Sequence, residues 1–241
     1  MPRGINSYDE ARLQGRNVAN AGSFNIVSPG IVTSGLVTHF DAGNYTSYPL
    51  SGTTWYDLSG LGTIATLVNG PVYSRDNGGY IIVDGIDDRI STTTAVPAFG
   101  TEYSFSFWVY IISLPSNGEQ QLFVCSNLGI SVATYLDGLW RWSSFEAVAN
   151  NVRYGSTVST GVWYNFVLTN TGSTTRFYVN GQFTNQFSNG PTLSSAGLTY
   201  FWNGVTRYMN ARLALAMAHN RSLNQLEVEQ NFNATRARFG I

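Results

Sequence analysis

The clearest pattern of apolar and polar positions in the chain predicts three consecutive β-strands between residues 163 and 187. Trp163–Thr169 is rich in aromatic and aliphatic residues, which fit a pleated surface, and it ends at a cluster of turn residues. Thr175–Val179 follows. The Asn180-Gly181 pair then tolerates the positive φ angles that a type I′ turn needs at both central positions. Because Gln182–Phe187 runs back, the segment predicts a meander at the centre of an antiparallel sheet.

Short apolar runs bounded by Gly, Asn, Asp, Ser and Pro recur from residue 35 to residue 220, at the spacing expected of a β-sandwich or barrel. Beside the meander, the predicted strands are Leu36–Phe40, Trp55–Leu58, Ala65–Val68, Gly79–Asp84, Arg89–Thr92, Tyr103–Ile111, Gln121–Ser126, Ile130–Tyr135, Leu139–Trp142, Val152–Gly155, Leu198–Trp202 and Ala211–Ala218.

The strand Tyr103–Ile111 alternates strictly, so its two faces can be separated. One face carries four apolar residues and is core (Phe105, Phe107, Val109 and Ile111). The other face is amphipathic, which predicts that it lines a groove or is covered by loops (Ser104, Ser106, Trp108 and Tyr110).

The two ends of the chain differ from the β-rich middle. Residues 222–237 predict a helix on an edge or end of the sandwich, with Ser222 as N-cap, Gln225 completing a capping box, and an apolar stripe (Leu223, Leu226 and Phe232). Residues 1–34 are polar and cannot bury enough surface to fold alone, which predicts a docking arm in front of a domain at 35–241. The docking residues expected in the arm are Arg3, Tyr8, Arg12 and Arg16.

The composition narrows the classes of function. Of 241 residues, 43% are hydrophobic and only 11% charged, which suggests that a partner covers part of the surface. The net charge is −1, without a basic stripe, which argues against nucleic acid. We also expect no secretory signal, no membrane span, and neither a disulfide nor a Cys-based metal site from the single Cys125.

The densest acidic cluster is Asp84-Gly85-Ile86-Asp87-Asp88, directly after an apolar strand. Its three carboxylates (Asp84, Asp87 and Asp88) could wrap a hard cation such as Ca²⁺, which takes 6–8 oxygen ligands. The alternative is that Asp84 and Asp87 accept loop amide hydrogens and pair with Arg89. Oxygens from Asp41 and Asn44 could add to the site, although nothing in the sequence brings them to it.

A second candidate site lies around the turn at residues 136–139. Trp140 and Trp142 are two positions apart on a short strand, which places them on the same face, where they could stack on sugar rings. Tyr135 and Asp137, at the turn, complete the candidate group. The alternative is that both indoles pack in the core or in a groove wall, since Trp is highly buried on average. Trp55, Trp163 and Trp202 are expected in the core or at its edge.

Catalysis has little support in the sequence. Retaining glycosidases need two carboxylates about 5–5.5 Å apart, and no predicted strand shows an alternating acidic pattern that would supply them. His39 and His219 have no nucleophile motif beside them, so we expect both to be structural.

Several stretches together resemble a known family: GLVTHFDAGN, TTWYDLSG, GGYIIVDGIDDRI, YSFSFWVYI, TRFYVNGQF and the closing NRSLNQLEVEQNFNATRARFG. They resemble the laminin-G-like jelly roll of the concanavalin-A-like lectin/glucanase superfamily, in the version found in virion structural proteins of tailed bacteriophages and cyanophages. The resemblance covers residues 31–241 and implies an all-β antiparallel sandwich with adhesive character. Many members bind calcium, but here Ala211-Arg212-Leu213-Ala214 lacks the acidic residue that their closing strand often carries.

From this resemblance we expect a non-enzymatic phage structural protein, in the capsid decoration or the tail, located in the virion and docked through its arm. Its expected partners are other virion proteins, copies of itself and a host-surface polysaccharide. The alternatives are a host-glycan-binding adhesin and, more remotely, a glycan hydrolase.

Overall fold

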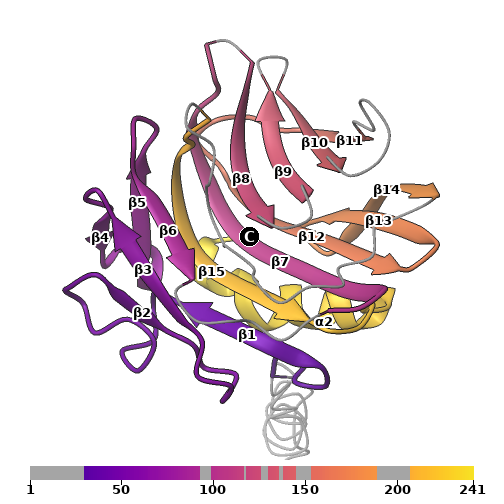
Figure 1. Cartoon of the computed structure of the whole chain (residues 1–241), viewed down its shortest axis with the longest axis horizontal. Helices are drawn as coiled ribbons and strands as arrows, with labels where there is room; N and C mark the ends of the chain where they lie inside the picture. The colour runs from indigo at the N-terminus through magenta and orange to yellow at the C-terminus, as the bar shows by residue number, and fades with distance from the viewer. Residues whose placement is uncertain are drawn as a thin grey trace, which may run out of the picture.

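A computed structural model of the chain describes residues 30–92, 99–116, 118–125, 130–135, 138–144, 153–188 and 207–241 (Figure 1). For residues 119, 123–125, 130–135, 140–144 and 153–155 it describes the backbone path alone. The predicted docking residues Arg3, Tyr8, Arg12 and Arg16 lie outside the described residues, as do Asp137 and the predicted strand Leu198–Trp202.

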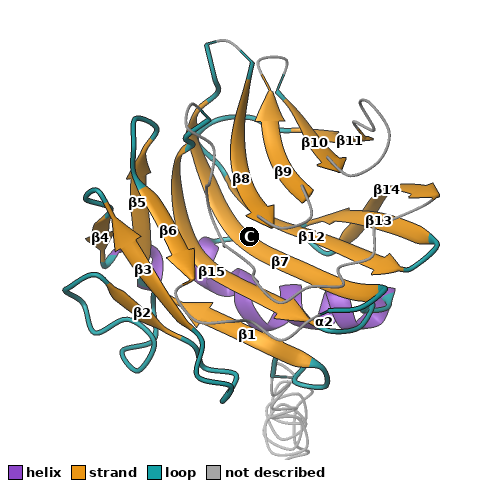
Figure 2. Cartoon of the chain, in the orientation of Figure 1, coloured by secondary structure: helices purple, strands orange, loops and turns teal. Residues whose placement is uncertain are grey.

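The described chain forms three antiparallel sheets (Figure 2). The largest has eight strands, in the order β14-β13-β12-β7-β15-β5-β4, and β1 also pairs with β15. Its members are β1 (Leu36–Asp41), β4 (Val72–Ser74), β5 (Tyr80–Asp84), β7 (Glu102–Ser113), β12 (Trp163–Thr171), β13 (Thr174–Val179), β14 (Gln182–Ser188) and β15 (Asn210–His219). One smaller sheet holds β2 (Thr54–Tyr56), β3 (Ile64–Val68) and β6 (Arg89–Thr92), and the other holds β8 (Glu119–Cys125), β9 (Ile130–Tyr135), β10 (Leu139–Ser144) and β11 (Arg153–Thr157).

Both smaller sheets pack on the inner face of the large sheet, as expected for a sandwich (Figure 1). The side chains of β7 show the reason. Phe105 and Phe107 point inward, where they share one core with Trp55 from β2, Ile90 from β6 and Leu122 from β8. The predicted all-β sandwich is therefore confirmed, and so is the tight turn of the meander at Asn180 (φ 52°) and Gly181 (φ 76°). The predicted central position of the meander was wrong, because β14, β13 and β12 form one edge of the large sheet.

The outer face of the large sheet is covered by the C-terminal segment, which comprises α2 (Gln225–Thr235) and the 3₁₀-helix η2 (Arg236–Phe239). Trp108 stacks on the rings of Phe239 and Phe232 at centroid distances of 4.0 and 5.8 Å, and its indole N–H donates to Thr235 Oγ1 at 2.8 Å. The helix therefore lies on a face of the sandwich, and the prediction of an edge or end position was wrong. The amphipathic face of β7 is covered, as expected, but helices cover this part of it instead of loops.

The helix also begins later than predicted, because another residue caps it. Asn224 is the N-cap: its side chain accepts the N–H of Glu227, and the Glu227 carboxylate accepts the N–H of Asn224. The predicted capping box of Ser222 and Gln225 is therefore wrong by two positions. Leu226, placed in the apolar stripe, is 75% exposed, and Val228 is buried in its stead.

Residues 30–34 lie against the C-terminal segment of their own domain. Asn231 Oδ1 accepts the N–H of Val32 at 2.7 Å, and the His219 imidazole bonds to the Val32 carbonyl at 2.9 Å. Gln230 donates to the Gly30 carbonyl and Arg221 to the Ser34 carbonyl. The chain therefore enters the sandwich at a fixed point beside α2. Among the described residues, no helix has the length and apolar character needed to cross a membrane.

Candidate functional site

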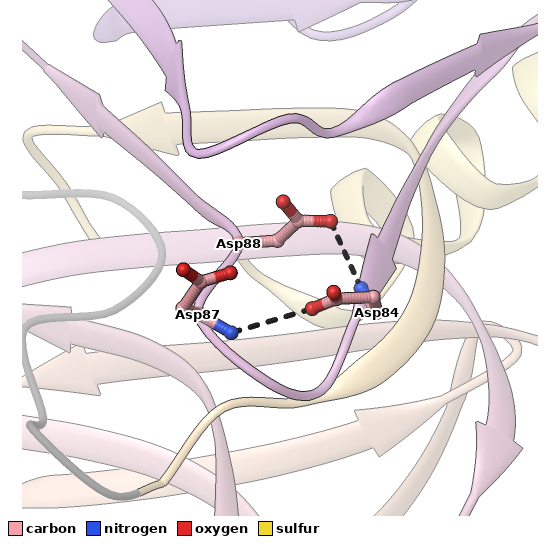
Figure 3. A group of neighbouring side chains, drawn as sticks. All are labelled: Asp84, Asp87 and Asp88. Carbon is pink, nitrogen blue, oxygen red and sulfur yellow. Dashed lines mark hydrogen bonds between the residues drawn. The ribbon is translucent and has the colours of Figure 1, made fainter.

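The acidic turn between β5 and β6, residues 84–88, is formed by hydrogen bonds to its own carboxylates (Figure 3). Asp84 Oδ1 accepts the backbone N–H of Ile86 at 2.8 Å and of Asp87 at 3.4 Å. Asp88 Oδ2 accepts the backbone N–H of Asp84 at 3.1 Å. Gly85 has a φ of 78° and lies so close to Asn210 of β15 that an added Cβ would meet the Asn210 Cβ at 2.9 Å. The turn is therefore fixed against the end of the large sheet.

The three carboxylates also come close enough together to share a cation. One oxygen from each of Asp84, Asp87 and Asp88 lies within 4.8 Å of the others, a span that two ligands on opposite sides of a Ca²⁺ ion, at 2.3–2.6 Å each, would cover. Asp84 and Asp87 are exposed, whereas Asp88 is buried. Burial and the neighbouring charge of Asp84 raise the pKa of Asp88.

The donor set fits a weak calcium site better than a tight one. Three carboxylates supply the charge that calcium favours, but they leave at least half of its 6–8 ligands to water or to a bound ligand. The structure confirms the alternative for Asp84, which accepts loop amide hydrogens, but in the described turn the second carboxylate that does so is Asp88 and not Asp87. Among the described residues, Arg89 forms no ion pair with Asp84 or Asp87, so that part of the alternative was wrong.

The other oxygens considered for this site are used elsewhere. Asp41 forms an ion pair with Arg238 at 2.5 Å and accepts the N–H of Gly43. Asn44 Oδ1 accepts the N–H of Thr46. Arg238 also donates to the carbonyls of Asn77 and Gly79, so Asp41 belongs to a clamp that fixes the C-terminal segment.

For the predicted aromatic site, the structure gives the backbone register. Position 140 of β10 pairs with Thr134, and position 142 with Val132. By this register, positions 140 and 142 belong to one face of the four-stranded sheet, whereas position 135, which pairs with Glu119 of β8, belongs to the other face. The surroundings of these side chains lie outside what the structure describes, so sugar stacking by Trp140 and Trp142 stays a prediction.

His219 is fully buried and His39 half-buried, and burial lowers the pKa of each. Since a carbonyl accepts, Nε2 of His219 donates to Val32, which leaves Nδ1 buried without a partner. His39 Nε2 is likewise buried without a partner. Neither ring is fully satisfied, although His219 has the tethering role expected of a structural histidine.

Comparison with known proteins agrees with this architecture. Residues 84–229 match the family described as the concanavalin A-like lectin/glucanases superfamily, and the chain belongs to it. Comparison with the curated proteins gives no match in sequence.

Solved structures show the same fold at low sequence identity. The binding domain of Paraclostridial Mosquitocidal Protein 1 is 17% identical, with a TM-score of 0.66 over 83% of this chain and 52% of that one. A Trypanosoma rangeli sialidase in complex with the inhibitor DANA is 19% identical, with a TM-score of 0.63 over 84% and 33% of the two chains. This chain thus spans about half of the toxin structure and a third of the sialidase.

A third structure matches over nearly its whole length. Domain 4 of AbnA, an extracellular arabinanase of Geobacillus stearothermophilus in complex with arabinotriose, is 16% identical, with a TM-score of 0.63 over 81% of this chain and 97% of that domain.

Proposed function

We propose that this chain is a carbohydrate-binding module without catalytic activity of its own. The observation that carries the proposal is the match, over 97% of its length, to an arabinanase domain that holds arabinotriose. At 16% identity the likeness is one of fold, so it supports an oligosaccharide as the class of ligand and not arabinotriose itself. Membership of a lectin/glucanases superfamily supports the same class.

The arrangement of the acidic turn argues for binding over hydrolysis. Retaining glycosidases place two carboxylates on either side of a sugar, about 5–5.5 Å apart. Asp84, Asp87 and Asp88 come instead from one short turn, where backbone N–H groups already occupy an oxygen of Asp84 and one of Asp88. Such carboxylates can hold a cation or accept from a hydroxyl, but they cannot enclose a glycosidic bond.

The test is an oligosaccharide array probed with the full chain, followed by titration of each hit in solution. We expect saturable binding to at least one class of glycan and no new reducing ends after prolonged incubation. A blank array across neutral and acidic glycans would contradict the proposal, and so would cleavage of a hit. If the sugar stacks on Trp140 and Trp142, Trp140→Ala and Trp142→Ala lower the affinity for the bound oligosaccharide. Tyr45→Ala is the control, because Tyr45 is an aromatic residue outside this strand that is 69% exposed, and it leaves the affinity unchanged.

The resemblance to phage virion modules adds a location to this proposal: the sandwich is displayed on a virion and docked through its N-terminal arm. Residues 30–34 of the expected arm are hydrogen-bonded to their own domain beside α2, so the proposal assigns the docking to residues 1–29. Deleting residues 1–29 should then abolish incorporation into particles and leave glycan binding intact. Unchanged incorporation would contradict docking by the arm.

A further inference from the structure

Beside η2, whose Phe239 packs on Trp163 at a centroid distance of 4.8 Å, the outer face of the large sheet carries a row of residues that are cross-strand partners. Val72 of β4 pairs with Ile82 of β5, Ile82 with Arg212 of β15, Arg212 with Tyr110 of β7, and Tyr110 with Trp163 of β12. Direct partners in an antiparallel sheet project from the same face. One arginine therefore stands in the middle of an otherwise apolar and aromatic row.

Two aromatic rings hold the arginine side chain. The guanidinium carbon of Arg212 lies 4.3 Å from the ring centroid of Tyr110 and 5.1 Å from that of Tyr80. Trp163 in turn packs its ring against both tyrosines, each at a centroid distance of 5.6 Å. Stacking of this kind limits the motion of the guanidinium without using its N–H donors.

The charge of Arg212 is not neutralised within the described part of the chain. Arg212 forms no ion pair or hydrogen bond there, and its Nε is buried without a partner. The described ion pairs belong to two other arginines, Arg221 and Arg238. A fixed guanidinium with unused donors is suited to a carboxylate, which it binds with two parallel hydrogen bonds.

The surface around Arg212 is partly open and mostly apolar, because Arg212 and its direct partners Ile82 and Tyr110 are half-buried. Val72 is 60% exposed, and Ile112, two positions beyond Tyr110 on β7, is 37% exposed. The nearest acidic position on β5 is Asp84, two residues beyond Ile82, and its Oδ1 accepts two backbone N–H groups. A second carboxylate, that of Asp76, accepts from the hydroxyl of Tyr80 at 3.3 Å. A ligand on this face therefore meets apolar and aromatic side chains around the Arg212 guanidinium, with carboxylates only at the border, which matches a sugar ring whose own carboxylate is placed on Arg212.

We propose that this outer-face row is a binding site for a carboxylate-bearing oligosaccharide, with a uronate or sialate carboxylate on the guanidinium of Arg212. The inference rests on the proposed carbohydrate-binding function and specifies its ligand as an acidic glycan. Val72 and Ile112 contact the C–H face of the sugar, and the stacked tyrosines position Arg212 without touching the carboxylate.

The experiment is calorimetric titration of the full chain with a set of acidic oligosaccharides, namely oligogalacturonate, oligoguluronate and sialyllactose, each paired with its carboxyl-reduced form. The variants are Arg212→Met, which keeps an unbranched apolar stem, and Arg212→Lys, which keeps the charge without the planar fork. Arg176→Met is the matched control, because Arg176 lies on the same face but three strands away, on β13. Melting temperatures of all variants show whether each one is folded.

We expect one acidic oligosaccharide to bind, its carboxyl-reduced form to bind about 10- to 100-fold more weakly, and Arg212→Met to lose the same factor, as is usual for charge-assisted hydrogen bonds. Arg212→Lys should keep part of the affinity, and Arg176→Met all of it. Binding that ignores carboxyl reduction, or that survives in a folded Arg212→Met variant, overturns the inference and leaves the proposed function standing. Equal binding of a polyglutamate peptide overturns the sugar assignment, and a chain that binds no glycan at all overturns both.

Discussion

Glu227 holds together the start of α2 and the entry of the chain into the sandwich, so its removal should be costly for a surface residue. Its two oxygens accept from both terminal nitrogens of Arg221 at 2.6 and 2.9 Å, and one also accepts the N–H of Asn224 at 2.9 Å. Arg221 additionally donates to the Ser34 carbonyl. The side chains of Arg221 and Glu227 are 27% and 23% exposed, so solvent screens this pair less than a fully exposed one.

The expected loss follows from these contacts. A helix cap is worth about 0.5–2 kcal/mol, and a hydrogen bond to a charged group about 1.5–3 kcal/mol, but a partly exposed arginine regains hydration when its partner leaves. We therefore expect Glu227→Ala to lower the free energy of unfolding by about 2–3 kcal/mol, which lowers the melting temperature by about 4–12 °C at this chain length. Glu227→Gln keeps one acceptor and should lose about 1 kcal/mol.

The assay is chemical and thermal unfolding of both variants, with Glu229→Gln as the control. Glu229 lies on the same helix and accepts one hydrogen bond, from Gln225, so its variant should change stability by less than about 0.5 kcal/mol.

Acid provides a second test of the same contact. The bond from Arg221 lowers the pKa of Glu227 below its ordinary 4.5, so the stabilisation is present above pH 4.5 and is lost as the pH falls through the lowered pKa. The stability gap between wild type and Glu227→Gln should therefore narrow in acid. A loss below about 0.5 kcal/mol in Glu227→Ala, or a gap that does not change with pH, would mean that the Glu227 carboxylate does not stabilise the start of α2.

Three further predictions concern buried groups. Trp108→Ala removes a fully buried indole stacked on Phe232 and Phe239, and should lower the free energy of unfolding by about 3–5 kcal/mol in denaturant titration, whereas a loss near zero would mean that η2 does not cover the sheet. Burial lowers the pKa of His219, so the neutral ring stabilises the fold above pH 6.5 and that stabilisation is lost as the pH falls; the melting temperature of His219→Gln should fall less in mild acid than that of wild type. Because the pKa of Asp88 is raised, its charge costs stability as the pH rises through that pKa, so Asp88→Asn should melt higher than wild type at neutral pH, and the difference should vanish below pH 3.8. In millimolar calcium only the wild type should gain melting temperature, and a gain by both proteins would argue against the cation site.

Much of the fold follows from local chemistry that the sequence displays. The Asn180-Gly181 turn was predicted because few residue pairs tolerate two positive φ angles, and β6 and β9 have their predicted bounds because turn residues flank them. The short strand Val72–Ser74 was missed, since a three-residue strand next to Gly-Pro leaves almost no periodic signal.

The errors concern contacts between segments that are distant in sequence. Both Ser222 and Asn224 are good N-caps, and the choice between them depends on Glu227, whose carboxylate Arg221 also binds. The position of α2 could not be predicted because Trp108 and Tyr110 resemble a groove lining until Phe239, about 130 residues later, packs beside them.

For the candidate sites, too, features that depend on local sequence could be predicted, and contacts between distant segments could not. The acidic turn was visible because its three carboxylates are neighbours in the sequence, and the two hydrogen bonds accepted by Asp84 Oδ1 follow from that spacing. Arg212 was noticed only as a departure from an acidic family pattern. Its stacking on Tyr80 and Tyr110 depends on the register of β5, β15 and β7, which no local pattern specifies.

Carbohydrate binding and the absence of hydrolysis can be tested in one sample. Saturation-transfer NMR spectra of the full chain with an array-selected oligosaccharide, recorded over several days, report on both. We expect saturation to be transferred from the protein to the protons of the sugar, the sugar to be displaced by an excess of a second array-selected oligosaccharide, and the anomeric spectrum to stay unchanged throughout. The absence of transfer for every oligosaccharide tried would contradict carbohydrate binding, and the appearance of new reducing-end signals would show that the chain is an enzyme.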